Sequence, residues 1–239
     1  MLTNNRTEYD LTKIPMVEIF ETIEGEGMAA GLPTTFIRLY NCNLRCSWCD
    51  TKYSYAPAKP EFTATISDII EQVNKFGNHN ICLTGGEPLL DKNKSSLLIQ
   101  ALSDLSFVKE IHIETNGAID LMPFINIRKS NSQISEKVRF VLDYKLPNSG
   151  EMGKMNLNNL GVLKDSDELK FVIGSEEDFL VALDVLNKYH KSGIVLMSPV
   201  WETMAPARLA SLILQHKLLD VKLNIQLHKI IWDPDARGV

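Results

Sequence analysis

The chain has 239 residues, of which 44% are hydrophobic and 23% are charged, a composition ordinary for a globular protein with a buried core. Its net charge of −5 argues against direct binding to nucleic acid or to an anionic membrane. No apolar run approaches the roughly 18 residues of a membrane-spanning helix, and the N-terminal segment lacks the basic and then apolar order of a secretory signal, so we expect a cytoplasmic protein.

Short runs rich in β-branched and aromatic residues alternate with helical patterns along the chain. The predicted strands cover residues 34–40, 80–84, 110–115, 138–144, 168–174, 194–198 and 221–227. The predicted helices cover residues 66–76, 94–105, 176–190 and 205–219. This alternation is typical of right-handed βαβ units, and we predict an α/β fold with parallel strands in a complete or partial (β/α) barrel.

The residues with the most chemistry follow directly after predicted strands. Cys42, Gly85–Glu87, Asn116–Gly117 and Lys145 each come at the end of a different strand. Because active sites of such barrels lie at the C-terminal ends of the strands, we expect these residues to lie at one edge of the sheet. The polar stretch 145–166 has no clear periodicity and is predicted to be a loop.

Three cysteines stand close together in NCNLRCSWCD, at Cys42, Cys46 and Cys49, and Cys82 is the fourth cysteine of the chain. In a reducing compartment such a group indicates metal binding or catalysis. Structural zinc needs a fourth ligand, which Cys82 or a histidine would have to supply, and a redox pair at Cys46 and Cys49 leaves one thiol without a role. The third interpretation is a [4Fe–4S] cluster held by three thiolates, with one iron open to another ligand.

The turn LTGGEPLL follows the predicted strand 80–84. Gly85 and Gly86 allow close approach to the backbone, Glu87 could meet a cationic amine, and Pro88 turns the chain away. By itself this sequence is also an ordinary strand-to-helix turn. Its position next to the cysteine cluster is what favours a ligand-binding role.

The segment ETIEGEG, residues 21–27, interleaves three carboxylates with glycines and suits neither a core strand nor a helix. It is either a solvated turn or a loop whose backbone and carboxylates accept hydrogen bonds from a donor-rich ligand. Arg38, four residues before Cys42, suits a substrate carboxylate, which a guanidinium can bind through two parallel hydrogen bonds. Burial of Arg38 would require an anion as partner.

The cysteine spacing followed by Gly-Gly-Glu-Pro resembles the radical S-adenosylmethionine (SAM) superfamily. The resemblance implies a barrel of the radical SAM type, a [4Fe–4S] cluster and SAM as cofactors, and a 5′-deoxyadenosyl radical as the reactive species. Trp48 matches the aromatic position near the adenine in such enzymes; its other interpretation is core packing. A glycyl-radical-activating enzyme would share these motifs and is an alternative, and a non-catalytic zinc-binding module is an alternative of another class.

From about residue 14 onward the chain resembles the family of 7-carboxy-7-deazaguanine synthases, through ETIEGEG, TGGEP, ETNG, DYKLP, DELKFVI, SPVWE and QLHKIIW. The resemblance implies conversion of 6-carboxy-5,6,7,8-tetrahydropterin to 7-carboxy-7-deazaguanine with loss of ammonia, in 7-deazapurine and queuosine biosynthesis. It implies substrate contacts at Ile23, Glu24, Gly25, Glu26, Arg38, Thr84 and the terminal carboxylate of Val239. It implies SAM contacts at Trp48, Cys49, Asp50, Gly85, Gly86, Glu87, Glu114, Asp143, Tyr144, Lys145, Ser198, Pro199, Val200 and Trp201, and a Mg²⁺ ligand at Thr51.

The chain departs from this family at two places. The family usually has glutamine at the position of Glu24, and an ionised carboxylate only accepts hydrogen bonds whereas an amide also donates. Residues 143–145 read Asp-Tyr-Lys, where many relatives have Ser-Pro-Lys, so Lys145 alone matches.

We expect one radical SAM domain over residues 1–239. It would consist of a substrate-binding segment at about 14–33, a partial barrel at 34–232 and a C-terminal tail at 233–239 that reaches the site. The resemblance implies a flavodoxin or ferredoxin as reductant. The apolar helix 205–219 could form a homodimer interface, although core packing explains it equally well.

Overall fold

A computed structural model describes residues 2–239 of the chain. The strands are β1 (Lys13–Ile23), β2 (Pro33–Leu39), β3 (Phe62–Thr65), β4 (Asn80–Gly85), β5 (Glu110–Thr115), β6 (Val138–Tyr144), β7 (Glu168–Ile173), β8 (Ile194–Pro199) and β9 (Val221–Leu223). The helices are α1 (Leu2–Leu11), α2 (Ile66–Phe76), α3 (Lys92–Ser103), α4 (Met122–Ser130), α5 (Ser132–Lys137), α6 (Glu176–Tyr189), α7 (Pro206–Gln215) and α8 (His228–Ile231). No helix in this range is both long and apolar enough to cross a membrane.

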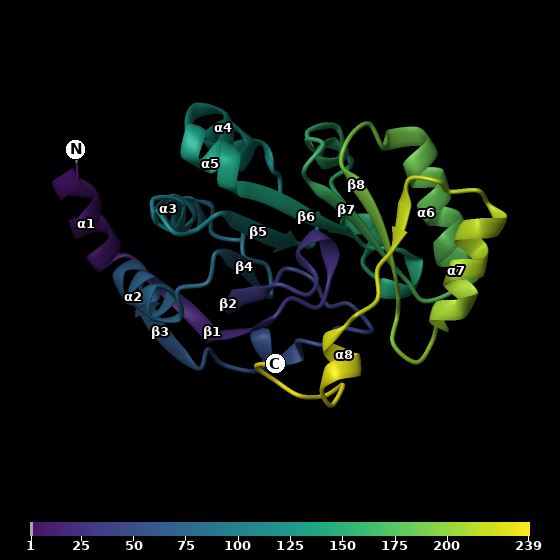
Figure 1. Ribbon diagram of the computed structural model, residues 1–239, viewed down its shortest axis with the longest axis horizontal. Coiled ribbons are helices and arrows are strands. Elements are labelled where there is room, and N and C mark those ends of the chain that lie inside the picture. The colour runs from purple at the N-terminus through teal and green to yellow at the C-terminus, as the bar shows by residue number, and fades with distance from the viewer. Residues whose placement is uncertain (1) are drawn as a thin grey trace.

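The nine strands form one open sheet in the order β3-β1-β2-β4-β5-β6-β7-β8-β9. From β2 to β9 all neighbours are parallel, whereas β1 is antiparallel to both β2 and β3. Figure 1 shows helices α2 to α7 along the outer side of this sheet, while the segment with α8 returns across the other side towards β1. The arrangement is an α/β partial barrel, as predicted.

Local sequence explains how the outer helices begin and where they pack. Thr65 caps α2 through a reciprocal capping box with Asp68, and Gly77 ends the helix in the left-handed conformation. Ile66, Ile69 and Val73 form the buried face of α2, as their spacing predicts. The same core contains buried residues of β4 and β5, so these strands pack against the helices that cover the outer side of the sheet.

The seven predicted strands are all present, and the expected helices match α2, α3, α6 and α7. The predicted strand 221–227 is wrong beyond Leu223, because Asn224 and Gln226 turn towards Glu26 instead of continuing the ladder. The sequence analysis missed β1, in which Glu21 and Ile23 pair with β2 even though carboxylates are rare in strands. The predicted loop 145–166 contains three short 3-10 helices.

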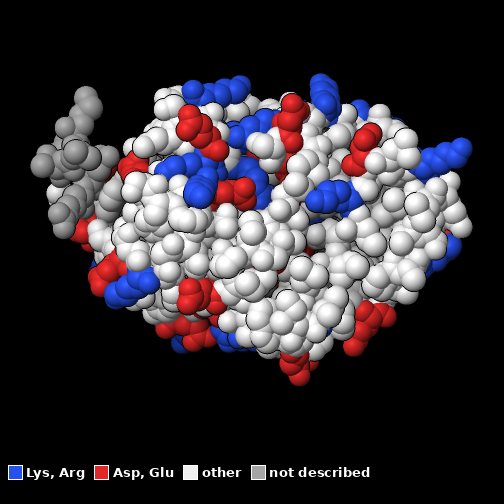
Figure 2. All heavy atoms as spheres, in the orientation of Figure 1, with Lys and Arg blue, Asp and Glu red and all other residues white. Residues whose placement is uncertain are grey.

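The C-terminal ends of β2 and of the strands from β4 to β8 lie at one edge of the sheet, because these strands are parallel and in register. The cysteine loop follows β2 and the glycine turn follows β4, so this edge collects the predicted motifs. Charged side chains of both signs are interspersed on the face of the molecule in Figure 2, with uncharged stretches between them. We see no single-sign field on that face to attract a polyanion.

Candidate active site

A cavity of about 460 Å³ opens at this edge of the sheet and extends from the cysteine loop to the C-terminal tail. It is lined by all of the residues that the sequence analysis assigned to the site except four: Glu87, Tyr144, Ser198 and Pro199. The structure therefore brings together segments that are far apart in the sequence, including the ETIEGEG segment and residues 234–239.

The cysteine loop presents three free, partly exposed thiols at one end of the cavity. The loop is anchored from outside, since Arg45 donates its backbone N–H to Glu151 at 2.6 Å. Asn116, from the ETNG turn, donates to the Cys42 sulfur at 3.7 Å. Burial raises the pKa of Cys46 to about 11, against the opposing effect of Lys145, so Cys46 is a thiol until a metal displaces its proton.

The spacing of the three sulfur atoms discriminates between the metals. Three thiolates on one zinc ion, each at about 2.3 Å, lie roughly 4 Å apart. Within the described chain, Cys42, Cys46 and Cys49 do not form a group whose ligand atoms all lie within 4.8 Å of one another. Three thiolates on a wider object, an iron–sulfur cluster, fit this donor set better than a single ion does.

Cys82 does not complete the cysteine set. It is buried in β4 beside Glu24 and His112, with which it forms a separate compact group. Two ionisable side chains therefore lie beside the Cys82 thiol.

The two glycines of the turn after β4 are required by close packing against the backbone that leads into the cysteine loop. A Cβ atom on Gly85 would lie 2.2 Å from the Leu39 carbonyl oxygen, and one on Gly86 would lie 2.2 Å from that of Asn41. Gly86 donates its N–H to Leu39 at 3.1 Å, and Glu87 donates its N–H to Asn41 at 2.8 Å. The glycines therefore let the turn pack against the start of the cysteine loop.

The Glu87 carboxylate points into the protein and not into the cavity. It accepts hydrogen bonds from the backbone N–H groups of Leu89 (2.9 Å) and Asn116 (2.8 Å) and from the Thr115 hydroxyl (3.0 Å). Burial raises its pKa to about 7, and these hydrogen bonds only partly offset that effect. Glu87 joins the glycine turn to the ETNG turn, and a direct cofactor contact stays a prediction.

The segment after β6 contributes a lysine beside the cysteine loop. Lys145 lies 2.8 Å from the Asp143 carboxylate and 5.9 Å from the centre of the Trp48 ring. Tyr144 points the other way, into the core, where its ring packs on Phe171. This alternation follows from the two-residue period of the strand, so Asp143 and Lys145 face the cavity and Tyr144 does not.

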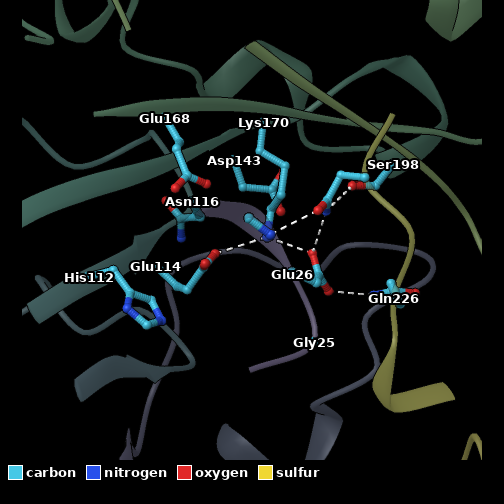
Figure 3. Close-up of polar contacts among 12 residues, drawn as sticks. Gly25, Glu26, His112, Glu114, Asn116, Asp143, Glu168, Lys170, Ser198 and Gln226 are labelled. Carbon is cyan, nitrogen blue, oxygen red and sulfur yellow. Dashed lines mark hydrogen bonds and ion pairs between the residues drawn. The ribbon is translucent and has the colours of Figure 1, made fainter. Parts of the chain in front are cut away.

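A buried lysine on β7 organises the other end of the cavity (Figure 3). Lys170 lies 2.9 Å from Glu114 and 3.3 Å from Glu26. Gln226 and Asn224 donate further hydrogen bonds to the Glu26 carboxylate, at 2.7 Å and 3.3 Å. Burial by itself would raise the pKa of Glu26, but Lys170 and Gln226 outweigh it and lower that pKa to about 2. Glu26 is therefore an ionised acceptor facing the cavity.

Asn224 also connects this group to the strand behind it. Its amide donates to the Ser198 hydroxyl at 2.8 Å, and its oxygen accepts the backbone N–H of Gly27 at 2.8 Å. Ser198 and the following Pro199 are buried and lie behind the cavity, which Val200 and Trp201 line instead.

The loop after β1 is held against the C-terminal segment. Leu227 donates its N–H to the Gly25 carbonyl at 3.0 Å, and a Cβ atom on Gly25 would lie 2.3 Å from the His228 ring. His228 and Gln226 line the cavity, as does Lys170. The sequence analysis quoted their motifs, QLHKIIW and DELKFVI, but assigned these residues no role, and their long-range contacts leave no local signal.

Arg38 lies on β2 with its guanidinium in the cavity lining. Its Nε donates to Glu18 at 2.7 Å, so the anion that burial requires comes from the protein. Among the described residues, the Nη groups of Arg38 donate no hydrogen bond. They are donors without a protein acceptor, on a residue that lines the cavity.

The hydroxyl group of Thr51 and the tail of the chain lie at the same mouth. The Thr51 hydroxyl donates to Asp50 at 2.7 Å, and both residues line the cavity. Arg237 stacks on the Tyr53 ring at 3.8 Å and lies 3.5 Å from Glu61. These contacts hold the C-terminal residues Gly238 and Val239 at the cavity wall.

Comparisons with known proteins agree with this geometry. Residues 36–200 match the family model described as the Radical SAM superfamily. The 7-carboxy-7-deazaguanine synthase of Clostridium acetobutylicum is 37% identical, over 94% of this chain and 98% of that protein. The enzyme of the same name from Leptospira interrogans is 34% identical, over 96% of this chain and all of that protein.

Two solved structures share the fold. Escherichia coli QueE superimposes with a TM-score of 0.67 at 21% identity, over 93% of this chain and 97% of that one. Streptococcus suis SuiB bound to S-adenosylmethionine superimposes with a TM-score of 0.56 at 16% identity, over 78% of this chain and 48% of that one.

Proposed function

Because the chain belongs to the 7-carboxy-7-deazaguanine synthase family of the radical SAM superfamily, we propose that its cavity converts 6-carboxy-5,6,7,8-tetrahydropterin to 7-carboxy-7-deazaguanine with loss of ammonia. The chain is a radical SAM lyase with a [4Fe–4S] cluster and SAM as cofactors. The observation that carries the substrate proposal is a pair of groups in the cavity lining. Glu26 offers an ionised acceptor and Arg38 offers free donors, in one space with the three cysteines.

Cys42, Cys46 and Cys49 would hold the cluster, and the space between the cysteine loop and the glycine turn would hold SAM. When bound, these groups supply a 5′-deoxyadenosyl radical that abstracts a hydrogen atom. The protein's part is to bind and orient the reactants and to exclude water. The proposed SAM contacts are Trp48, Cys49, Asp50, Gly85, Gly86, Glu114, Asp143, Lys145, Val200 and Trp201, which line the cavity.

The pterin would lie between the loop after β1 and the C-terminal tail. Its aminopyrimidinone ring offers N–H donors, which the ionised Glu26 can accept. The carboxylate of the pterin would accept hydrogen bonds from the Nη groups of Arg38, because Glu18 accepts only from its Nε. The proposed contacts also include Ile23, Glu24, Gly25, Thr84 and the terminal carboxylate of Val239, supported by their place in the cavity wall.

A Mg²⁺ ion would use oxygen ligands at the mouth of the cavity. Thr51 and Asp50 offer a hydroxyl and a carboxylate side by side, which are ligands that Mg²⁺ prefers. The substrate carboxylate would be a further ligand, so the ion would orient the pterin relative to Arg38.

The remaining parts of the proposal concern the environment of the enzyme. A flavodoxin or ferredoxin would reduce the cluster, and a reducing cytoplasm would keep the cysteines free. A homodimer would cover the end of α7, where Leu214 and Leu219 are 77% and 90% exposed. We propose a single domain, in which residues 14–33 bind substrate, residues 34–232 form the partial barrel and residues 233–239 close the site.

The test is anaerobic turnover of the carboxypterin by reconstituted protein with SAM, Mg²⁺ and dithionite. We expect 7-carboxy-7-deazaguanine by mass spectrometry, and no product from Cys46→Ala, which also loses its iron. Cleavage of SAM without conversion of the pterin would contradict the proposed substrate and would leave a protein glycine as the substrate to examine. A colourless protein with bound zinc would contradict the cluster.

A further inference from the structure

Three buried side chains at the substrate loop form a compact group: Glu24, Cys82 and His112. The proposed function gives no part to Cys82 or His112. The ligand-type atoms of the three residues all lie within 4.8 Å of one another. They come from different elements, the loop after β1, β4 and β5. His112 and Glu114 lie on the same side of β5, two residues apart (Figure 3), so His112 lies next to the group that holds Glu26.

The Glu24 carboxylate makes all of its hydrogen bonds within the protein. Its Oε1 accepts the backbone N–H groups of Gly25 at 2.9 Å and Glu26 at 3.2 Å. Its Oε2 lies 2.6 Å from Nε2 of His112. The carboxylate therefore fixes the backbone of the two residues that follow it, and the second of these is the proposed acceptor for the pterin.

A charge balance explains why this contact is short. Glu24 is 6% exposed, and a buried carboxylate is costly without a counter-charge. Burial by itself would lower the pKa of His112, but the neighbouring Cys82 and Glu24 raise it well above its ordinary value. The ring also faces Glu110 at 3.7 Å, and Glu110 is itself paired with Arg139 at 2.7 Å. The imidazolium form is thus matched by the carboxylate of Glu24.

A metal ion fits the same three residues less well. Nε2 of His112 and Oε2 of Glu24 would have to bind the ion, each at about 2.0–2.2 Å. Those two atoms lie 2.6 Å apart, a distance typical of a charge-assisted hydrogen bond. The geometry is that of an ion pair.

We propose that His112 is a positioning residue for the pterin: it holds the Glu24 carboxylate so that this carboxylate binds the N–H groups of Gly25 and Glu26 and sets the substrate loop. The inference rests on the proposed function for the identity of the ligand. The loop geometry itself does not depend on it. Neither His112 nor Glu24 needs to touch the substrate through its side chain.

The test is a double-mutant cycle of Glu24→Gln and His112→Gln, with His79→Gln as the control because His79 is exposed and its ring bonds to the Phe107 carbonyl, not to Glu24. The readouts are the KM and kcat for the carboxypterin and the hydrogen exchange of the backbone N–H groups of Gly25 and Glu26. Exchange is measured on the protein without pterin, so that it reports on the loop alone.

His112→Gln leaves a buried carboxylate without its cation. We expect KM to rise about tenfold with kcat nearly unchanged, and the two N–H groups to exchange about tenfold faster, the scale of one charge-assisted hydrogen bond. Glu24→Gln alone leaves the imidazole without its anion and should act in the same direction. In the double variant, the amide introduced at position 24 can accept from the loop and donate to the amide introduced at position 112, so KM and exchange should return to within about threefold of the wild type.

Either of two kinetic and exchange results would overturn the inference. One is a His112→Gln protein that matches His79→Gln in both readouts, and the other is a double variant that is no better than the single variants. Stoichiometric zinc retained by Glu24, Cys82 and His112 in chelator-treated protein would also overturn it. A failure of the proposed function is separate, because it would show as absent turnover in the wild type.

Discussion

Gly86→Ala should separate the glycine turn from the cysteine loop. The new Cβ would lie 2.2 Å from the Asn41 oxygen and 2.8 Å from the Cys42 Cβ, so the two segments must move apart by about 1 Å. The hydrogen bonds Gly86 N–H to Leu39 and Glu87 N–H to Asn41 would weaken, at about 0.5–1.5 kcal/mol each. With about 1–3 kcal/mol of overpacking, the loss of unfolding free energy is about 2–6 kcal/mol.

The assay compares Gly86→Ala with Gly161→Ala, where a Cβ atom meets nothing within 4 Å. Neither glycine has a positive φ, so the comparison isolates the steric effect. We expect anaerobic urea unfolding of the metal-free proteins to show the loss at Gly86 alone. Reconstituted Gly86→Ala should also hold less iron per chain, because Cys42 is displaced. Equal stability and equal iron content in the two variants would refute this account of the glycine turn.

Three further predictions concern the substrate end of the cavity. First, Arg38→Lys should keep the cluster and raise the KM for the carboxypterin by tenfold or more, because an ammonium cannot bind Glu18 and a carboxylate in the same forked geometry; an unchanged KM would exclude the carboxylate role. Second, the folded-state pKa of Glu26 is about 2, below its ordinary value of 4.5. Ionised Glu26 therefore adds to the free energy of unfolding above pH 4.5, on the order of 3 kcal/mol. This contribution is lost as the pH falls towards 2. In Lys170→Met, the group that does most to offset the burial of Glu26 is removed and the pKa of Glu26 rises. The free energy of unfolding should then fall as the pH rises from about 4 to 8. Chemical denaturation across this range checks the sign, and parallel curves for variant and wild type would contradict it. Third, removal of Gly238 and Val239 should raise the KM for the pterin without changing cluster content, which iron analysis and steady-state kinetics together would measure; an unchanged KM would remove the tail from the site.

Patterns that act over short distances were readable in the chain. The period of apolar residues predicted the parallel strands and the helices that cover them, because side-chain direction repeats locally. The capping of α2 by Thr65 follows the same logic. The three cysteines and the two glycines could be recognised because each motif lies within a few residues, and their positions after consecutive strands brought them to one edge of the sheet.

Some local patterns misled for physical reasons. The ETIEGEG segment has too many carboxylates for an ordinary strand, yet its first residues belong to β1, where pairing with β2 decides the conformation. Strand β9 ends early because the side chains of Asn224 and Gln226 donate hydrogen bonds to the Glu26 carboxylate. Glu26 lies near the other end of the chain, so the local sequence of β9 does not show this partner. The side chains of β6 alternate between its two sides, but the family resemblance implied a SAM contact at Tyr144. The strand directs this side chain into the core.

By itself the sequence determined the cofactor chemistry of this protein, because the three thiols and the glycine turn are encoded by spacing along a few residues. Only the tertiary structure decided which charged side chains pair with each other around the proposed substrate site. Lys170 meets Glu26 across 144 positions, and His112 meets Glu24 across 88. Such pairs are set by the register of parallel strands and by how the C-terminal segment returns to the sheet. No local pattern can encode them, because the free energy that favours each charge depends on a partner that only folding brings near.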